Sequence, residues 1–299
     1  MKKDFLTIRD LTEDELRGLI DRGLEIKKRG RVNSSPLSGR TLGLMFDKSS
    51  TRTRISFETA MFRLGGQTVF MSRADTQLSR GEAVKDTARV LSRYIDAIAV
   101  RTYAQDLVEE MAFWAEVPVI NALTDQYHPC QILSDLMTVK ERRGTIDNMK
   151  VAWIGDGNNV ANSWINAAAV LGFELVLACP PQYRPDPKLL EVSGENIRVV
   201  EDPTAAAIGA DVINTDVWIS MGQDKEREQR LKSFEGFQLN ASLVSLCKPG
   251  VLVMHCLPAH RGEEITDDVL EGPHSVVFDQ AENKMHFHQA LLEKLITDN

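Results

Sequence analysis

The chain has 299 residues, enough for two medium-sized domains. It carries 43 Asp and Glu against 35 Lys and Arg, a formal net charge of -8, which argues against nucleic acid as the main partner. The four cysteines form no CxxC pair, the N-terminus lacks a long apolar segment and no run of about 18 apolar residues occurs. These features predict a reduced, cytoplasmic protein without a signal peptide or membrane span.

Strand and helix patterns alternate along the first half of the chain. Thr12 and Glu15 have the spacing of a capping box, which predicts a helix from there to Arg29. The apolar runs predict strands at Leu42–Phe46, Thr68–Met71, Ala97–Val100 and Val117–Asn121. Helical spacing predicts helices at Thr53–Leu64, Glu82–Tyr94, Gln105–Glu116 and Pro129–Arg143.

The same alternation starts again at Lys150. Predicted strands are Val151–Ile154, Glu174–Ala178, Ile197–Val200, Val212–Thr215, Val251–His255 and Val276–Phe278. Predicted helices are Asn159–Leu171, Glu226–Phe234, Ala241–Leu246 and Lys284–Ile296. We therefore expect an α/β protein with two doubly wound parallel-sheet domains, at 1–145 and 149–282, and the active site in the cleft between them. The C-terminal helix, 284–299, is expected to pack back on the first domain.

The segment Ser50-Thr51-Arg52-Thr53-Arg54 stands between a predicted buried strand and a predicted helix. A helix N-terminus offers unpaired N–H groups and the positive end of the helix dipole, and both attract anions. Hydroxyl caps are common there, but two cations are unfavourable unless an anion is present. The segment therefore predicts a site for a phosphate or another compact dianion.

Further polar residues follow the predicted strands of the first half. Gln77 lies in the loop Asp75–Glu82, Arg101 follows the strand Ala97–Val100, and His128 precedes a proline that suits the first position of a helix. Each alone has a structural explanation, as a solvated loop, a surface cap or an N-cap. Together they mark the strand ends at which ligands bind in open α/β sheets.

The glycine-rich segment Gly155–Ala161 resembles a dinucleotide fingerprint only weakly, because the third glycine is missing. Glu174, the acidic residue at the expected distance, precedes its strand instead of ending it. A nicotinamide oxidoreductase therefore remains a weak alternative. Asn158 and Asn159 at the helix N-terminus are instead candidates to bind a substrate carboxylate.

Two clusters follow the last strands. Asp216 falls at a strand end, where its carboxylate can hold an amine, and a turn at Ser220–Gly222 follows. His255, Cys256 and His260 flank a Leu257-Pro258 bond that is a candidate for the cis form. Their spacing does not match a zinc module, so no metal site is predicted. Cys256 as a covalent nucleophile stays open on the residues alone.

These motifs, taken together and in this order, resemble the aspartate/ornithine carbamoyltransferase family, over a stretch from Phe5 to the final helix. The motifs are Ser-Thr-Arg-Thr-Arg, His-Pro-Cys-Gln, Asp-x-x-x-Ser-Met-Gly and His-Cys-Leu-Pro, at Ser50–Arg54, His128–Gln131, Asp216–Gly222 and His255–Pro258. The last two elements are typical of the ornithine enzymes. The resemblance implies transfer of a carbamoyl group from carbamoyl phosphate to the side-chain amine of L-ornithine, giving citrulline and phosphate. It also implies a homotrimer with no metal or organic cofactor, and favours arginine biosynthesis over breakdown.

The resemblance also implies roles for individual residues. The carbamoyl phosphate residues would be Ser50, Thr51, Arg52, Thr53, Gln77, Arg101, His128, Gln131, Cys256, Leu257 and Lys284. The ornithine residues would be Asn159, Asp216, Ser220 and Met221, and the catalytic residues would be Arg101, His128, Asp216 and Cys256. Cys256 then orients the amine, because direct attack by the amine needs no acyl-enzyme. Arg54 has no implied contact and is expected to brace the loop.

One residue departs from the family pattern. The run Asn283-Lys284-Met285-His286 has lysine where the family usually has an arginine that touches carbamoyl phosphate. Lysine keeps the charge but loses the planar fork, so we expect weaker or water-bridged binding there. The remaining alternatives are a carbamoyltransferase for putrescine or an N-acylornithine, and a non-catalytic ligand-binding homologue.

Overall fold

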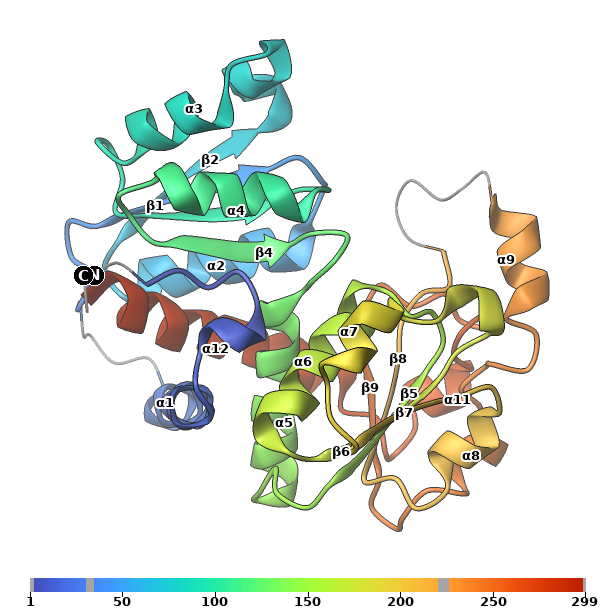
Figure 1. The fold of residues 1–299 in the computed structure, drawn as a ribbon. Coiled ribbons are helices and arrows are strands. Elements are labelled where there is room, and N and C mark those ends of the chain that lie inside the picture. Colours follow the sequence, from blue (N-terminus) through green and yellow to red (C-terminus); the bar gives the residue numbers. More distant parts are fainter. Residues whose placement is uncertain (1–2, 31–34, 220–225, 298–299) are drawn as a thin grey trace. The chain divides into compact units, whose positions relative to one another are not determined.

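The computed structural model describes residues 3–30, 35–219 and 226–297, and the chain folds as two compact units (Figure 1). Unit 1 consists of Met1–Met137 and Glu282–Asn299, and unit 2 of Thr138–Ala281. Each unit has one parallel sheet with helices, so the predicted α/β class with two parallel-sheet units is confirmed. The domain limits 1–145, 149–282 and 284–299 stay predictions.

The sheet of unit 1 has four strands, all parallel. In spatial order they are β2 (Gln67–Ser72), β1 (Thr41–Phe46), β3 (Ala97–Arg101) and β4 (Val119–Leu123). β1 and β3 are buried along their whole length, which explains why the sequence shows continuous apolar runs there instead of alternation. The order of the strands reverses direction between β1 and β3, the point at which ligands bind in such sheets.

The helices of unit 1 are arranged around this sheet. They are α1 (Glu13–Arg29), α2 (Thr51–Arg63), α3 (Val84–Leu91), α4 (Gln105–Trp114), and the relevant parts of α5 (Pro129–Arg143) and α12 (Val277–Thr297). α1 begins at the predicted capping box, since the backbone N–H of Thr12 donates to Glu15 Oε2 at 3.0 Å. Met45, Ile98 and Val100 of the sheet pack with residues of α3 and α4 in one apolar core.

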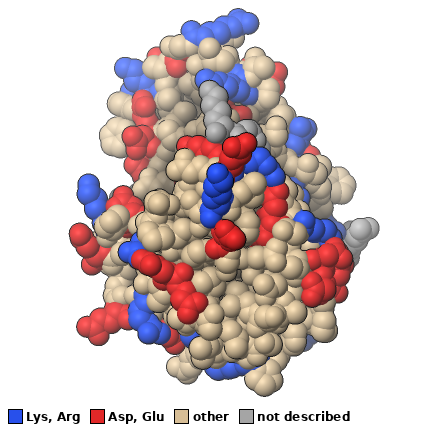
Figure 2. All heavy atoms as spheres, turned by 90° about the vertical axis from the view of Figure 1, so that its right-hand side faces the viewer, with Lys and Arg blue, Asp and Glu red and all other residues tan. Residues whose placement is uncertain are grey.

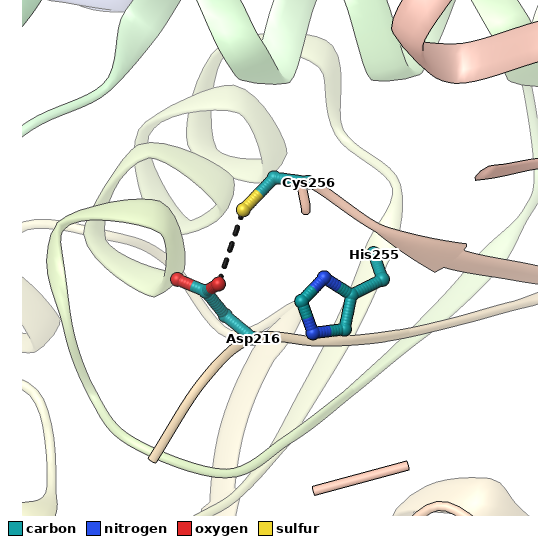
Figure 3. Close-up of side chains that lie close together, drawn as sticks. All are labelled: Asp216, His255 and Cys256. Carbon is teal, nitrogen blue, oxygen red and sulfur yellow. Dashed lines mark hydrogen bonds between the residues drawn. The ribbon is translucent and has the colours of Figure 1, made fainter. Parts of the chain in front are cut away.

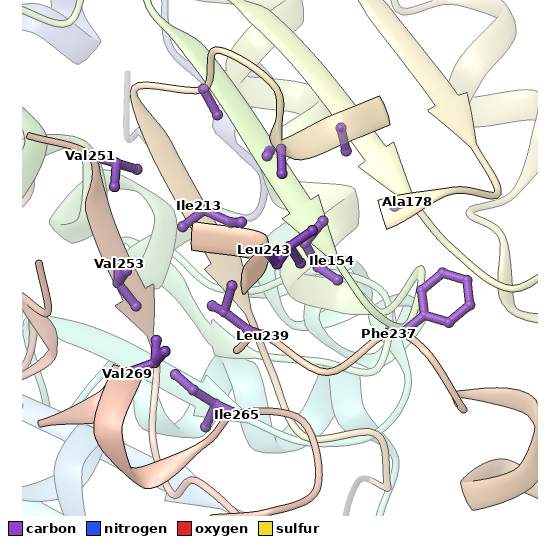
Figure 4. Packing of buried hydrophobic residues seen from close by; sticks show 14 of the residues in the cluster. Ile154, Ala178, Ile213, Phe237, Leu239, Leu243, Val251, Val253, Ile265 and Val269 are labelled. Carbon is purple, nitrogen blue, oxygen red and sulfur yellow. The ribbon is translucent and has the colours of Figure 1, made fainter. Parts of the chain in front are cut away.

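The sheet of unit 2 has five parallel strands. In spatial order they are β7 (Ile197–Val200), β6 (Glu174–Ala178), β5 (Lys150–Ile154), β8 (Val212–Thr215) and β9 (Leu252–His255), with the reversal between β5 and β8. The helices are α6 (Asn159–Leu171), α7 (Pro187–Glu191), α8 (Pro203–Ala207), α9 (Arg227–Ser233), α10 (Ala241–Val244) and α11 (Asp267–Leu270). Ile154, Ile213 and Val253 pack with Leu243 and Val269 of α10 and α11 in the main core (Figure 4).

One predicted strand is wrong. Val276–Phe278 does not form a strand, because α12 begins at Val277 and continues to Thr297. The pair of valines has strand propensity, but Val276 is buried just before a long helix and Val277 is buried in its first turn, so tertiary packing overrides the local preference. Only a single bridge, between Ser275 and Val253, touches the sheet there.

One face of the molecule carries positive and negative side chains side by side. On the face shown in Figure 2, Lys and Arg side chains alternate with Asp and Glu over the described residues. An anionic ligand approaching this face would therefore meet no broad positive field and would have to be recognised locally. Among the described residues, no helix has both the length and the apolarity to cross a bilayer.

Candidate functional site

The predicted site residues of unit 1 follow the carboxyl ends of three adjacent strands. Ser50 comes four residues after β1, Arg101 is the last residue of β3, and His128 follows β4 and precedes α5. Since neighbouring parallel strands end at the same edge, the fold brings together groups that are up to 78 residues apart in sequence (128 minus 50). The edge is the one at which α/β sheets bind ligands.

The first turn of α2 with its N-cap, residues 50–53, is built like an anion site, and we call it the anion turn. Ser50 is the N-cap, and its hydroxyl accepts a hydrogen bond from the backbone N–H of Thr53 at 3.2 Å. Thr51 and Arg52 are exposed on this turn, whereas Thr53 is buried at 2% exposure. The first turn contains no acidic residue that would itself neutralise the helix N-terminus.

Lys284 of α12 brings a positive charge to this turn. Its ammonium donates to Gln131 Oε1 at 2.9 Å and to Thr53 Oγ1 at 3.2 Å, and it lies 3.5 Å from His128 Nε2. The side chain is buried, with 5% of the residue exposed. Lys284 therefore links α12 to α2 and α5 within unit 1.

His128 is kept neutral by its surroundings. Burial lowers the pKa of His128 well below its usual value, and the nearby charges of Lys284 and Arg101 lower it further. A neutral imidazole offers one N–H donor and one bare nitrogen. Gln131 is held in turn by Asp135, whose Oδ1 accepts from Gln131 Nε2 at 2.7 Å.

A second histidine, His288, is linked to the anion turn through the hydroxyl of Ser56. The hydroxyl of Ser56 donates to the Thr53 carbonyl at 3.0 Å, and its oxygen lies 3.0 Å from His288 Nδ1. Because that hydroxyl hydrogen is already used, Nδ1 of His288 is the donor. The His288 ring stacks on Phe57 with 3.6 Å between centroids, and burial lowers the pKa of His288 well below its usual value. Sequence reasoning missed this residue, because nothing in its local pattern distinguishes it.

Two residues of unit 1, the predicted site residue Gln77 and the motif residue Arg54, have other surroundings. Gln77 begins the short 3-10 helix η3 (Gln77–Arg80) and is exposed. Arg54 turns away from the anion turn: its Nε donates to Glu58 at 2.9 Å and its guanidinium lies 3.6 Å from the centre of the Phe70 ring. These contacts join Arg54 to its own helix and to β2, and its expected role in bracing the loop stays a prediction.

The candidate site of unit 2 is built around Asp216, directly after β8. Its Oδ2 accepts a hydrogen bond from Asn158 Nδ2 at 2.9 Å, and its Oδ1 accepts one from the thiol of Cys256 at 3.1 Å (Figure 3). Asn158 is also the N-cap of α6, since its Oδ1 accepts from the backbone of Val160 and Ala161. The three groups come from the carboxyl ends of β5, β8 and β9, at the reversal of strand order.

The predicted asparagine is the neighbour of the one that contacts Asp216. Asn159 is the first residue of α6 and is partly exposed, whereas Asn158 bonds the carboxylate. A role for Asn159 in binding ornithine stays a prediction. Ser220 and Met221 lie outside the described residues.

Leu257 has an unusual backbone that His255 holds in place. Its φ is 59°, a left-handed conformation that costs a non-glycine residue roughly 1–2 kcal/mol. The backbone N–H of Leu257 donates to His255 Nδ1 at 2.9 Å, and His255 Nε2 lies 3.0 Å from Glu264 Oε1. The following Leu257-Pro258 bond is cis, as predicted.

Asp216, His255 and Cys256 come close enough together to be considered as metal ligands. Both ring nitrogens of His255 are already engaged, with Leu257 and with Glu264. That leaves two donor groups, Asp216 and Cys256, which already bond each other. Two ligands are too few for a zinc site.

Comparison with known proteins places this arrangement in a family. The family model of the aspartate/ornithine carbamoyltransferase carbamoyl-P binding domain matches residues 3–141, and that of the Asp/Orn binding domain matches residues 147–295. The chain belongs to the aspartate/ornithine carbamoyltransferase family. The helix N-terminus at Ser50 thus lies in the part matched by the carbamoyl-P model, and Asp216 in the part matched by the Asp/Orn model.

Individual relatives agree over the full length. The ornithine carbamoyltransferase of Desulfotalea psychrophila is 55% identical over 99% of this chain and 100% of its own. That of Nitrosococcus oceani is 51% identical over 98% and 97%. Among solved structures, ornithine carbamoyltransferase from Pyrococcus furiosus has a TM-score of 0.95 at 46% identity, covering 100% of this chain and 98% of that one.

The neutral histidines predict a loss of stability in acid. In the unfolded chain each titrates near pH 6.5, but in the folded chain the pKa is depressed, so the unfolded state binds more protons below pH 6.5. The contribution of the two histidines to the free energy of unfolding is therefore fully present above pH 6.5. It is lost as the pH falls from there toward the pKa of the folded state. Between pH 7.5 and 5.5 we expect His288 to account for about 1 kcal/mol of the loss.

Chemical denaturation of His288→Gln at both pH values measures this contribution. The difference in unfolding free energy between pH 7.5 and 5.5 should shrink relative to the parent protein. His274→Gln, at an exposed histidine, is the matched control and should leave the difference unchanged. An equal difference in His288→Gln and the parent would contradict the burial argument.

Proposed function

We propose that the protein transfers the carbamoyl group of carbamoyl phosphate to the side-chain amine of L-ornithine, giving L-citrulline and phosphate. The observation that carries the proposal is the anion turn of α2, where Thr53, His128 and Lys284 converge in unit 1. The names of the full-length relatives agree with this activity. The binding roles of single residues are part of the proposal.

Carbamoyl phosphate would bind in unit 1. Its phosphate would accept from the N-terminal N–H groups of α2 and from Ser50, Thr51 and Arg52, because a guanidinium fork and a helix N-terminus both match phosphate oxygens. Gln131 would contact the carbamoyl group beside His128. Gln77 would have to reach the ligand from the exposed η3 segment, a contact that requires that segment to move.

The other polar groups of unit 1 would stabilise the negative charge that forms during the reaction. The neutral side-chain amine attacks the carbonyl carbon, so a C–N bond forms and negative charge builds on the carbonyl oxygen. The C–O bond to phosphate then breaks, the phosphate leaves with that electron pair, and the nitrogen gives up its extra proton, which the departing phosphate can accept. Arg101, neutral His128 and Thr53 would stabilise the first charge, and Lys284 with the helix N-terminus the second. Removing one such donor typically costs ~3 kcal/mol of barrier, about a hundredfold in rate.

Ornithine would bind in unit 2, with Asp216 facing its amine. Asp216 is buried and held by Asn158, so its carboxylate is fixed in direction before any ligand arrives. The thiol of Cys256 donates to the same carboxylate, which supports an orienting role for Cys256. A thiolate nucleophile there would face a neighbouring negative charge. Asn159, Ser220 and Met221 complete the proposed ornithine residues, and Leu257 would contact the carbamoyl group.

We further propose that the enzyme is a homotrimer and acts in arginine biosynthesis. Large apolar side chains of unit 1 are exposed in the single chain, with Phe62 at 80%, Phe113 at 77% and Tyr94 at 74%, as expected of a subunit that buries surface on assembly. Another relative, 40% identical with a TM-score of 0.94, is the anabolic ornithine carbamoyltransferase of Campylobacter jejuni.

The substrate proposal is tested by phosphate release. The purified protein is mixed with carbamoyl phosphate and, in separate reactions, with ornithine, putrescine, N-acetylornithine or aspartate. Release well above the spontaneous rate should occur with ornithine alone, and citrulline should form in equal amount. Release with another amine, or none with ornithine, would overturn the proposal.

Asp216→Asn should lose at least about a hundredfold in the rate of citrulline formation, because the carboxylate no longer orients the amine.

Lys284 gives a second test. Lys284→Arg restores a planar fork at the anion turn, so the Michaelis constant for carbamoyl phosphate should fall several-fold. Lys27→Arg is the matched control: Lys27 bonds Asn283, the neighbour of Lys284, but lies outside the anion turn, so its replacement should leave the constant unchanged. An unchanged constant in Lys284→Arg would mean that this position does not limit carbamoyl phosphate binding.

A further inference from the structure

A tight turn after Cys256 brings together three side chains of types that can bind a metal ion. The backbone N–H of Glu263 donates to the His260 carbonyl at 2.9 Å, and that of Gly262 donates to Ile265 at 2.8 Å. Gly262 has a φ of 90°, which the turn requires and which a side chain would disfavour. The turn places His260, Glu263 and Glu264 on one side, with donor atoms all within 4.8 Å of one another.

Glu264 is the most telling of the three. It is fully buried, and its Oε1 lies 3.0 Å from His255 Nε2 and accepts the backbone N–H of His260 at 2.6 Å. Its other oxygen, Oε2, is also buried but has no hydrogen-bond partner among the described residues. A buried carboxylate oxygen without a donor is costly. This oxygen lies 3.9 Å from His260 Nδ1.

Glu263, like Glu264, has one paired carboxylate oxygen and one buried oxygen close to His260. Its Oε1 pairs with Arg227, while its Oε2 is buried, has no hydrogen-bond partner among the described residues and lies 3.8 Å from His260 Nδ1. Separations of 3.8 and 3.9 Å are too long for hydrogen bonds. They are close to the spacing of ligand atoms around one ion, since bonds of about 2.0–2.2 Å in tetrahedral geometry put the ligands roughly 3.4 Å apart.

We propose that His260 Nδ1, Glu263 Oε2 and Glu264 Oε2 bind one divalent transition-metal ion of the zinc type. One imidazole and two carboxylates suit Zn²⁺, and the two glutamates with Arg227 leave a net charge of minus one to attract it. His260 is 44% exposed, so water can enter from its side and complete the coordination. This site is separate from the proposed substrate residues and does not depend on the activity.

One residue of this site is linked through His255 to the proposed substrate residue Leu257. Glu264 would hold the ion with Oε2 and His255 with Oε1, and His255 in turn accepts from the backbone of Leu257. The ion would therefore brace the turn that follows Cys256. Binding to the folded chain alone also raises the melting temperature by mass action.

Calorimetric titration of Zn²⁺ into untagged, chelator-treated protein tests the proposal. The parent chain should bind one ion, and both Glu263→Gln and His260→Ala should lose at least tenfold in affinity. These residues are partly exposed, so their replacement should leave the fold intact, which circular dichroism checks. His274→Ala, at an exposed histidine outside the turn, is the control and should bind like the parent. Zn²⁺ should raise the melting temperature of the parent and of His274→Ala only.

A second readout identifies the ligands. Co²⁺ in place of Zn²⁺ should give the absorption of a nitrogen and oxygen site without a thiolate charge-transfer band. The proposal is overturned if the parent binds no ion, or if Glu263→Gln and His260→Ala bind as tightly as the parent. It is also overturned if the cobalt spectrum shows a thiolate band that Cys256→Ser removes, because the ion would then sit on the cysteine.

Discussion

The structure of unit 1 depends on the burial of one ammonium group. Lys284 is almost inaccessible to water, and its charge would be costly there without acceptors. Thr53 Oγ1 and Gln131 Oε1 supply them, and His128 lies just beyond. The lysine thus fixes the distance between α2, α5 and α12 at the place where the anion turn begins. Burial is the main cause of the lowered pKa of His128, and the positive charge of Lys284 lowers it further. The contacts of Lys284 therefore shape the proposed phosphate site and help to keep its imidazole neutral.

The candidate site of unit 2 contains a buried carboxylate in place of a buried ammonium group. Asp216 receives one hydrogen bond from an amide and one from a thiol, so its two oxygens are oriented by neutral donors and its negative charge stays uncompensated by a cation among these partners. Such a group is suited to an ammonium ligand. Ser50 and Arg101 of unit 1 and Asp216 of unit 2 follow strands at the reversal of strand order, so the same fold rule positions the proposed anion site in one unit and the proposed amine site in the other.

The sequence predicted those elements correctly that depend on residues close together in the chain. The buried strands of both sheets, the capping box at Thr12 and the hydroxyl cap at Ser50 all follow from short-range rules. The failures have a tertiary origin. Val276–Phe278 reads as a strand but lies at the start of a helix whose burial decides its form. The stacking of His288 on Phe57 depends on how distant segments meet, which periodicity does not encode.

The central claim is that the two units bind different substrates through opposite charges. Calorimetric titration of carbamoyl phosphate, without ornithine, into Lys284→Met and Asp216→Asn tests it most directly. The account predicts that Lys284→Met weakens binding by about tenfold or more, since a charged hydrogen bond is worth roughly 1.5–3 kcal/mol, and that Asp216→Asn binds like the parent. Parent-like binding by Lys284→Met, or an equal loss in Asp216→Asn, would contradict it.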